Sequence, residues 1–373
     1  MEPAVIDRRA LLAAGAASAL ASPALARADG PVRIAAARLT HGHVGWLLGR
    51  EAIGDIELVG IYEPDAELAA RHVRDFRLDP ALIHAELGSM LDAVRPEAVA
   101  AFGAVSEHLS VVEAAAPRGV AVMVEKPLAF EAQVAERIAA LAARHGTPVL
   151  TNYETTWYPS GYALKAALDQ GGIGAVRRVV FRDGHWGPKE IGVSPEFLSW
   201  LTDPVQNGGG ALIDFGCYGA NLMTWLMGNV APTSVMAVTS RSKTDPAYAA
   251  VDDEATVVLT WPQAQAVIQA SWNWPDHRKD MEVFGETGYL RAPTPGEVFQ
   301  RVRGEAAETV VPVPAMSAAH RDGFAYLAAV LRGRETMAAA DRSSLANALV
   351  VARILDAARR SAATGHRVDL APV

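Results

Sequence analysis

The sequence predicts a two-domain α/β protein, in which a doubly wound parallel sheet precedes an α/β domain with an open, largely antiparallel sheet. A chain of 373 residues is too long for one small core and suits two domains. Up to about Leu150, apolar runs alternate with helical patterns, as in parallel sheets. Beyond residue 151, long β-rich runs follow one another with turn residues between them, as in antiparallel sheets.

In the first half of the chain the expected strands and helices alternate regularly. The apolar runs are short and bounded by polar residues, whereas the segments between them have the length and spacing of amphipathic helices. In order, we expect strand 34–37, an amphipathic segment, strand 56–62, helix 64–76, strand 98–105, helix 106–118, strand 120–124, helix 130–145 and a strand from 149.

In the second half, two helices near 160–170 and 212–227 flank the β-rich runs. These runs are 176–185, 235–239, 255–261, 266–274 and 281–290. Two separators, Pro262-Gln263 and Gly285 to Gly288, are typical of hairpin turns. Helices near 321–331 and 343–362 complete the chain. The predicted domains are therefore 29–150 and 151–316, with residues 317–373 packing back on the body.

Composition narrows the class of protein. Half of the residues are hydrophobic and 20% are charged, which is typical of globular proteins. The net charge is −8 and no run of Lys or Arg occurs, so we expect no nucleic-acid partner. The single cysteine, Cys217, excludes an intrachain disulfide framework and a multi-cysteine metal site, and we expect it to be a small buried residue.

The first 28 residues have the features of an export signal. Arg8 and Arg9 precede a short apolar stretch at 10–21, and Ala26-Arg27-Ala28 provides a cleavage site. The paired arginines favour the twin-arginine route, although Asp7 before them departs from its usual pattern. We therefore expect a periplasmic protein without a membrane span after signal removal. The alternative is a disordered, Ala-rich tail.

The turn after the first strand resembles a dinucleotide-binding turn without its glycines. In such folds glycines let the backbone approach the pyrophosphate, which rests on a helix N-terminus. The motif G-x-G-x-x-G would place its glycines at Arg38, Thr40 and His43, all of which differ. Thr40, His41 and His43 could still donate hydrogen bonds to phosphate, and Arg38 could add charge. An ordinary strand-to-helix turn is the alternative.

The same histidines raise the question of a metal. His41 and His43 could be two zinc ligands, but the sequence offers no further ligand cluster near them. We therefore expect no metal centre.

Two further signals lie at expected strand ends. Glu63 ends the second strand, where a carboxylate can accept hydrogen bonds from a ribose diol. No Lys or Arg follows it to hold a 2′-phosphate, which favours NAD over NADP; a solvated acid is the alternative. Lys126, within Glu125-Lys126-Pro127, closes an apolar strand and would lie in the ligand crevice of a parallel sheet.

A third signal follows three glycines, in the segment DFGCYGAN. Asp214 and Tyr218 are four residues apart, so on one helix they would share a face. Tyr218 could donate and accept a proton near a substrate hydroxyl. Core packing is the alternative for such a tyrosine.

Together these motifs resemble the Gfo/Idh/MocA oxidoreductase family. The resemblance covers residues 32–371 and includes the Glu125-Lys126-Pro127 box, the GGG…D-x-G segment, GETGYL at 285–290 and SAATGHRV at 361–368. It implies a Rossmann domain followed by an α/β domain whose open sheet often forms an oligomer interface. It also implies NAD(P)-dependent chemistry on sugars, cyclitols and related polyols.

One departure from the family pattern is informative. Many members carry D-x-x-x-H, whereas this chain has Tyr218 at the histidine position, which resembles the D-x-G-x-Y-x-x-N variant of the glucose-fructose oxidoreductase and dimeric dihydrodiol dehydrogenase type. The resemblance implies that Lys126 and Tyr218 are catalytic and that Asp214 orients the substrate. We also expect Lys126, next to a positively charged nicotinamide, to help lower the pKa of Tyr218, because cations stabilise a phenolate.

The remaining candidates follow from these considerations. The cofactor-binding candidates are Arg38, Leu39, Thr40, His41, Glu63, His108, Glu125, Lys126 and Asn152. The substrate-binding candidates are Tyr153, Trp157, His185 and Trp186. Aromatic side chains among them suit a pyranose ring.

The expected function is oxidation or reduction of a carbohydrate or polyol. Because free NAD is scarce outside the cytoplasm, an exported enzyme would have to hold its cofactor tightly, and a redox-neutral net reaction would regenerate it. One alternative is NAD-assisted glycoside cleavage by transient oxidation and elimination. Another is a non-catalytic sugar-binding protein.

Overall fold

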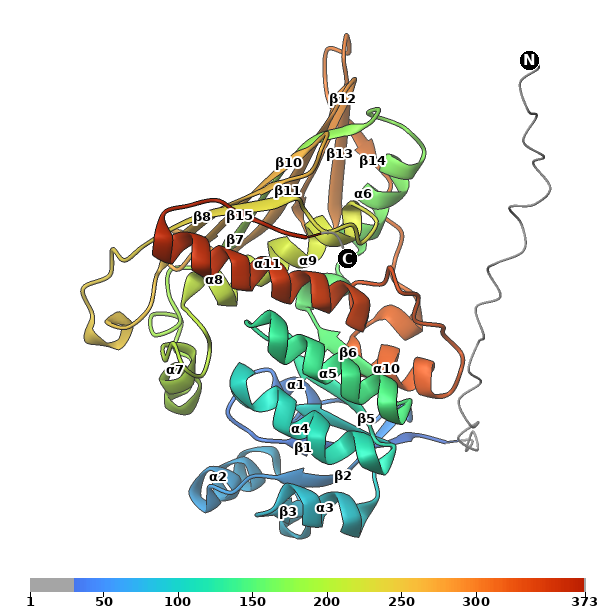
Figure 1. The fold of residues 1–373 in the computed structure, drawn as a ribbon. Coiled ribbons are helices and arrows are strands. Elements are labelled where there is room, and N and C mark those ends of the chain that lie inside the picture. Colours follow the sequence, from blue (N-terminus) through green and yellow to red (C-terminus); the bar gives the residue numbers. More distant parts are fainter. Residues whose placement is uncertain (1–29, 372–373) are drawn as a thin grey trace, which may run out of the picture.

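A computed structural model describes residues 30–371 of the chain, which form two sheets with helices around and between them (Figure 1). The predicted export signal at 1–28 lies outside the described residues. Within the described residues, no helix has the length and apolarity needed to cross a membrane.

The first sheet is parallel throughout and has the strand order β3-β2-β1-β4-β5-β6. Its strands are β1 (Val32–Ala37), β2 (Ile56–Tyr62), β3 (Ile83–His84), β4 (Ala98–Ala101), β5 (Ala121–Glu125) and β6 (Val149–Asn152). The order reverses between β1 and β4, which is the switch point where ligands bind in doubly wound sheets. The predicted parallel domain is confirmed.

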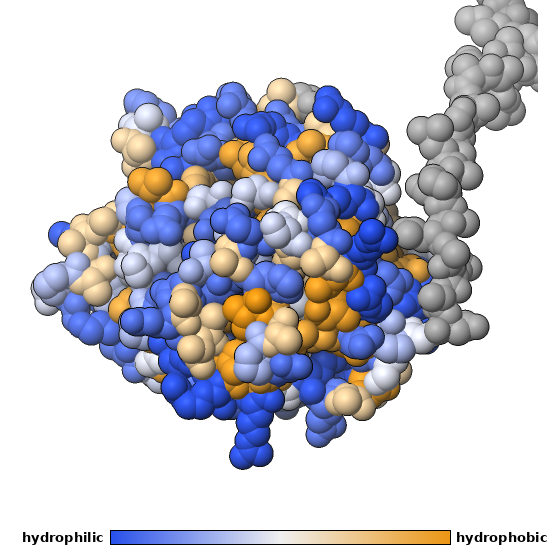
Figure 2. Space-filling model, turned by 90° about the horizontal axis from the view of Figure 1, so that it is seen from below, coloured by the Kyte–Doolittle hydropathy of each residue, from blue (hydrophilic) through white to orange (hydrophobic). Residues whose placement is uncertain are grey.

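Helices cover both faces of this sheet. They are α1 (Val44–Leu48), α2 (Ala66–Phe76), α3 (Leu87–Val94), α4 (His108–Ala115) and α5 (Ala132–His145). The strand predicted at 98–105 ends earlier than expected, at Ala101, because the chain turns there and the Phe102 N–H donates to the Ala37 carbonyl across the sheet end. The surface of this end of the molecule is mainly hydrophilic, with small apolar groups between (Figure 2).

The second sheet is open and antiparallel except for one pair. Its order is β14-β13-β12-β11-β7-β10-β9-β8-β15, and only β7 and β10 run parallel. The strands are β7 (Val176–Gly184), β8 (Ser234–Ser240), β9 (Glu254–Thr260), β10 (Gln265–Ser271), β11 (Arg278–Gly285), β12 (Gly288–Thr294), β13 (Glu297–Val302), β14 (Thr309–Val311) and β15 (Val368–Asp369). Both predicted hairpin turns are present, between β9 and β10 and between β11 and β12.

The helices of the second half lie between the two sheets and along their sides (Figure 1). They are α6 (Pro159–Asp169), α7 (Pro195–Leu201), α8 (Ala211–Asp214), α9 (Gly216–Leu226), α10 (Gly323–Leu331) and α11 (Leu345–Thr364). The long helix α11 packs against α9 and β8 of one half and α5 of the other. One helix was predicted at 212–227, but the structure interrupts it at Phe215, where α8 ends and α9 begins.

The segment around α7 crosses from the second domain to the first. Glu196 in α7 forms an ion pair with Arg71 of α2, and the Ser106 N–H donates to the Gln206 carbonyl over 3.0 Å. Phe197 and Trp200 of α7 pack on the ring of His41, with ring centroids 4.5 and 5.7 Å away. This segment therefore closes one side of the space between the domains.

Candidate active site

A cavity of about 940 Å³ lies where the carboxyl edge of the parallel sheet meets the second domain. Lys126 enters from the end of β5, Asp214 and Tyr218 from α8 and α9, and His185 from the end of β7. The structure thus brings together all three predicted catalytic residues, which come from different elements. Their catalytic roles stay a prediction.

Lys126 and Asp214 form a buried ion pair. The Lys126 ammonium donates to Asp214 Oδ1 and, over 2.9 Å, to the Asp214 carbonyl. Trp272 Nε1 donates to Asp214 Oδ2 over 3.0 Å. Burial opposes charge on the lysine, but the Asp214 carboxylate outweighs it and raises the pKa of Lys126. Lys126 therefore carries a fixed positive charge in the cavity.

Tyr218 is buried beside two ammonium groups. Its ring lies 5.1 Å from Lys126 Nζ and 4.5 Å from Lys279 Nζ. Even so, burial, and after it the Glu154 carboxylate, raises the pKa of Tyr218 well above its ordinary value. Among the protein's own groups burial therefore decides this pKa, since each ammonium is already paired with a carboxylate; the lowering expected from Lys126 together with a positive nicotinamide stays a prediction. Tyr218 is a neutral phenol at physiological pH.

Asp214 and Tyr218 come from two short helices and not from one, because the helix is interrupted at Phe215. Both side chains nevertheless approach the Lys126 ammonium. Asp214 ends α8 and Tyr218 lies in the first turns of α9, and both still line the cavity.

The glycine-poor turn keeps a glycine-like backbone. Arg38 has φ 71°, in the left-handed region that glycine ordinarily supplies. Its guanidinium forms ion pairs with Glu63 over 2.6 Å and with Glu107 over 3.2 Å. The buried Glu63 carboxylate also accepts the Leu39 N–H over 2.9 Å. These contacts hold the turn that the missing glycines would otherwise form.

Other cofactor-binding candidates lie on the neighbouring strand ends. Glu125 accepts hydrogen bonds from Asn152 Nδ2 and pairs with His43 Nδ1, each over 2.9 Å. Although burial opposes it, this His43 contact lowers the pKa of Glu125 to about 2. Buried His108 binds the Leu128 carbonyl through Nδ1 over 3.2 Å, and Thr40 Oγ1 donates to the Phe102 carbonyl. These residues form one continuous polar edge.

A third potential metal ligand was not found from the sequence. One ligand atom each of His41, His43 and Glu125 lies within 4.8 Å of the others. However, His41 Nδ1 accepts the His43 N–H over 3.1 Å, so neutral His41 carries its proton on Nε2 and offers that nitrogen no lone pair. A metal would require a different tautomer, and the absence of a metal centre stays a prediction.

The predicted substrate-binding residues are in different places. His185 lines the cavity, and half-exposed Trp186 stacks edge-on against His277 at 4.7 Å. Tyr153 is fully buried behind Tyr218, with ring centroids 5.8 Å apart. Trp157 donates from Nε1 to Asn152 Oδ1 over 3.0 Å. Of the four predicted substrate-binding residues, His185 is the one that lines the cavity.

Sequence reasoning missed several residues of the cavity. Lys279 of β11 forms an ion pair with Glu154, and Glu154 accepts the hydroxyl of Tyr158. His277 and Arg278 also line the wall. The Trp-Pro-Asp-His-Arg-Lys run before the apolar part of β11 was the available signal, because a cluster of ionisable residues at a strand start is a candidate binding segment.

His185 makes stability depend on pH. Burial lowers its pKa to about 4, whereas an unfolded histidine has a pKa of about 6.5. Between these values the unfolded state binds more protons, so the free energy of unfolding should fall as the pH is lowered from about 6.5 to about 4. Urea unfolding of wild type and His185→Gln over this range will check it. The wild type should lose more stability than the variant, and parallel pH profiles would contradict the assignment.

Two family models match the two halves of the chain. Residues 35–153 match the oxidoreductase family with an NAD-binding Rossmann fold, and residues 162–291 match the Gfo/Idh/MocA C-terminal domain. The matched ranges coincide with the parallel sheet and with the larger part of the antiparallel sheet.

Similar proteins include sugar, polyol and diol dehydrogenases. Trans-1,2-dihydrobenzene-1,2-diol dehydrogenase of Bos taurus is 30% identical over 156 residues, which are 42% of this chain and 42% of that protein, so the match spans less than half of its length. Inositol 2-dehydrogenase of Pseudomonas syringae pv. syringae is 30% identical over 258 residues, 68% of this chain and 72% of that protein.

The solved structures agree in fold. The aldose-aldose oxidoreductase of Caulobacter crescentus, solved with glycerol, has a TM-score of 0.73 at 21% identity, covering 91% of this chain and all of that one. An inositol dehydrogenase homologue from Azotobacter vinelandii, solved with NAD⁺, has a TM-score of 0.76 at 18% identity, covering 92% and 98%. With the sequence matches, these findings place the chain in the Gfo/Idh/MocA oxidoreductase family.

Proposed function

We propose that the protein is an NAD(P)-dependent oxidoreductase that acts on a hydroxyl or carbonyl group of a carbohydrate or polyol. The observation that supports this most is the meeting of Lys126, Asp214 and Tyr218 in one cavity at the carboxyl edge of the parallel sheet. A phenol and a fixed ammonium at such an edge suit proton transfer and charge stabilisation at one substrate oxygen.

The groups at the sheet edge fit a nicotinamide dinucleotide. Glu63 follows β2, where ribose hydroxyls need an acceptor, and would bind them by exchanging part of its present contacts with Arg38 and the Leu39 and Asp65 N–H groups. The left-handed backbone of Arg38 preserves the turn on which a pyrophosphate would rest. Thr40 and His43 would add donors beside it, and Glu125 and Asn152 would hold the nicotinamide end. Such a cofactor supplies the hydride acceptor or donor.

The protein's own groups would manage the proton and the charge. Tyr218 exchanges a proton with the substrate oxygen, donating it when a carbonyl is reduced. Lys126 stabilises the negative charge that develops on this oxygen, and Asp214 holds the ammonium in place. Because Tyr218 is neutral before reaction, it can accept the proton of a substrate hydroxyl only as a phenolate, and the added positive charge of an oxidised cofactor would favour that phenolate by lowering the pKa of Tyr218.

We propose NAD rather than NADP as the cofactor. Arg38 is matched by two carboxylates, Glu63 and Glu107, so this cluster is net negative and would repel a 2′-phosphate. Glu63→Gln should lower the ratio Kd(NADP)/Kd(NAD) by about tenfold, or about 1.4 kcal/mol. Both Kd values are measured by titrating nucleotide-free protein with each reduced cofactor and following the cofactor's fluorescence. Arg71→Gln is the control, because Arg71 forms its ion pair with Glu196 of α7. An unchanged ratio in Glu63→Gln would argue against a ribose-facing carboxylate.

The proposed location is the periplasm, reached through the twin-arginine route with the cofactor already bound. Protein purified from the exported fraction without added nucleotide should release nearly stoichiometric NAD(H) on denaturation, identified by mass and absorbance. Empty protein that also fails to bind added NAD(P) would overturn the enzyme proposal. A redox-neutral net reaction is then tested by supplying one sugar to oxidise and a second to reduce.

We also propose a homo-oligomer formed through the second sheet. α8, α9 and α11 lie on the side of this sheet that faces the parallel sheet, which leaves its other face for a second copy (Figure 1). Light scattering during size exclusion gives the mass directly, and a species with the mass of one chain (39.5 kDa with the signal, less after its removal) would refute it.

A further inference from the structure

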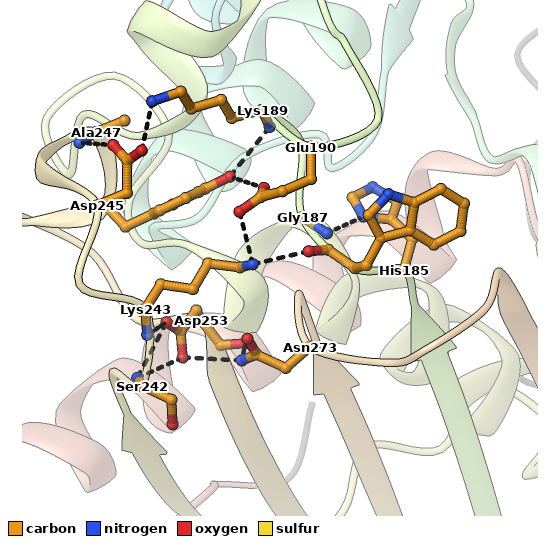
Figure 3. A network of polar contacts seen from close by, with 12 residues as sticks. His185, Gly187, Lys189, Glu190, Ser242, Lys243, Asp245, Ala247, Asp253 and Asn273 are labelled. Carbon is orange, nitrogen blue, oxygen red and sulfur yellow. Dashed lines mark hydrogen bonds and ion pairs between the residues drawn. The ribbon is translucent and has the colours of Figure 1, made fainter.

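Two histidines of the cavity share one local geometry. His41 Nδ1 accepts the N–H of His43 over 3.1 Å, and His185 Nδ1 accepts the N–H of Gly187 over 3.0 Å (Figure 3). A backbone N–H can only donate, so each Nδ1 must be unprotonated. Each neutral ring therefore carries its proton on Nε2, and this nitrogen is a hydrogen-bond donor.

Both rings remain neutral under physiological conditions. His41 and His185 are 2% and 7% exposed. Burial is the main cause that lowers the pKa of His41 well below its ordinary value and the pKa of His185 to about 4. Neither ring can then act as a proton acceptor at Nε2, which distinguishes them from a general base.

The surroundings hold the His185 loop in place. Lys243 Nζ donates to the Trp186 carbonyl over 2.7 Å and to Glu190 over 2.8 Å, and Tyr248 also donates to Glu190 (Figure 3). A Cβ atom at Gly187, which has φ 126°, would lie 2.1 Å from Glu190 Oε2. The loop geometry that presents the Gly187 N–H therefore depends on a glycine and on this anchor.

His41 and His185 both line the cavity that holds the Lys126–Asp214 pair, and the charges of Lys126 and Asp214 act on the pKa of both rings. Since each Nδ1 is bound to a backbone N–H, Nε2 is the ring nitrogen left for a ligand in the cavity. Across residues 30–371, no protein acceptor meets either Nε2–H, and neither nitrogen is among the fully enclosed atoms without a partner. Five carboxylates line the cavity, and four of them already accept from protein groups: Asp214 from Lys126 and Trp272, Glu154 from Lys279 and Tyr158, and Asp280 and Glu282 from Arg182. The fifth, Asp276, is exposed, so the buried part of the cavity offers more unused donors than unused acceptors.

We propose that His41 and His185 are fixed hydrogen-bond donors that make the cavity select a sugar derivative with a carbonyl or carboxylate oxygen over the corresponding hydroxyl compound. A carbonyl or carboxylate oxygen only accepts hydrogen bonds and can take these donors without loss. A hydroxyl must also find an acceptor for its own proton, and a buried donor left without one costs free energy. This inference rests on the proposed function for its sugar class.

The tautomers can be measured without turnover. In protein labelled with ¹⁵N-histidine, His41→Gln and His185→Gln assign two of the ten histidines. Both should show protonated Nε2 and bare Nδ1, with unchanged ¹⁵N shifts between about pH 5.5 and 8, where an ordinary histidine titrates. A protonated Nδ1, or a titration of either ring in this range, would overturn the assignment of fixed donors.

The ligand class is tested by calorimetry on the holoenzyme with two matched pairs. D-gluconate against D-glucitol probes a carboxylate, and dihydroxyacetone against glycerol probes a ketone. At least one oxidised compound should bind about tenfold more tightly than its hydroxyl partner, because the latter loses about one hydrogen bond. Equal affinities in both pairs would overturn the selectivity.

Two variants connect that preference to the histidines. His185→Phe should abolish the preference for the oxidised compound, whereas His185→Gln, which keeps an N–H donor, should restore part of it. A preference that survives both His41→Phe and His185→Phe would refute their role. If none of the four compounds binds, the ligand class is wrong. Bound NAD(H) together with correct tautomers would then show that the failure lies in the substrate class and not in the fold or the cofactor.

Discussion

Replacing Lys126 by methionine is expected to lower kcat by about 10²- to 10³-fold, the usual effect of removing one group that stabilises developing charge. The Lys126 ammonium lies 5.1 Å from the centre of the Tyr218 ring and is the positive charge that the first domain contributes there. Methionine has a similar length and no charge. The same change leaves the Asp214 carboxylate buried with only Trp272 as a side-chain donor, which should cost about 3–5 kcal/mol of stability. Steady-state kinetics and urea unfolding measure the two effects separately.

A double variant distinguishes lost catalysis from lost stability. Lys126→Met combined with Asp214→Asn removes both charges of the pair, so most of the lost stability should return while kcat remains low. Lys279→Met is the matched control. Its ammonium also lies over the Tyr218 ring, but its partner Glu154 is partly exposed and tolerates the loss better. Activity of Lys126→Met within tenfold of wild type would remove Lys126 from the mechanism.

The parallel sheet could be predicted because its strands are buried on both faces and read as continuous apolar runs. Ile56–Tyr62 was predicted with both boundaries correct, and the run at 120–124 became β5, Ala121–Glu125. The position of Lys126 followed from this, since a residue that ends a parallel strand lies at the ligand edge. β13 was missed because polar residues interrupt its apolar ones (EVFQRV), and β14 because it has only three residues.

The interruption between α8 and α9 was beyond the reach of periodicity. The close packing before α8 was also beyond its reach: a Cβ at Gly210 would lie 1.8 Å from the Asp252 carbonyl oxygen, and one at Gly208 would overlap the Phe130 ring. Asp252 in turn accepts the N–H groups of Gly210 and Leu212 and fixes the start of α8. Such a constraint depends on residues some 40 positions away along the chain.

The electrostatics of the cavity were likewise invisible in the sequence. Lys279 and Glu154 are 125 residues apart, and their pairing exists only because β11 passes the start of the second domain. Since each lysine near Tyr218 already has a carboxylate partner, burial dominates the pKa of that tyrosine. An argument from Lys126 and its sequence neighbours does not include these distant partners.

Replacing Tyr218 by phenylalanine is expected to lower kcat by about 10²- to 10⁴-fold, the range for a positioned proton donor, with little change in stability. Within residues 30–371 the Tyr218 hydroxyl has no hydrogen-bond partner, so its removal breaks no protein contact. Because the pKa of Tyr218 lies well above 10, the phenol stays protonated at neutral and mildly alkaline pH. The rate of carbonyl reduction should therefore not fall as the pH is raised through this range. Kinetics in both directions and thermal unfolding test these expectations.

Tyr153 provides the matched control for this change. It is a neighbouring buried tyrosine, edge-on to Tyr218, and its hydroxyl is enclosed without a partner. Tyr153→Phe removes an unsatisfied polar group, so stability should stay the same or rise by about 1 kcal/mol, and kcat should change little. If Tyr218→Phe and Tyr153→Phe lose activity equally, the two rings contribute through packing. If Tyr218→Phe retains more than a tenth of the wild-type kcat, the proton must come from another group. His41 and His185 cannot accept the proton in place of Tyr218, because the unprotonated Nδ1 of each ring is bound to a backbone N–H. If Tyr218→Phe loses activity and Tyr153→Phe keeps it, the proton transfer is therefore assigned to the phenol of Tyr218.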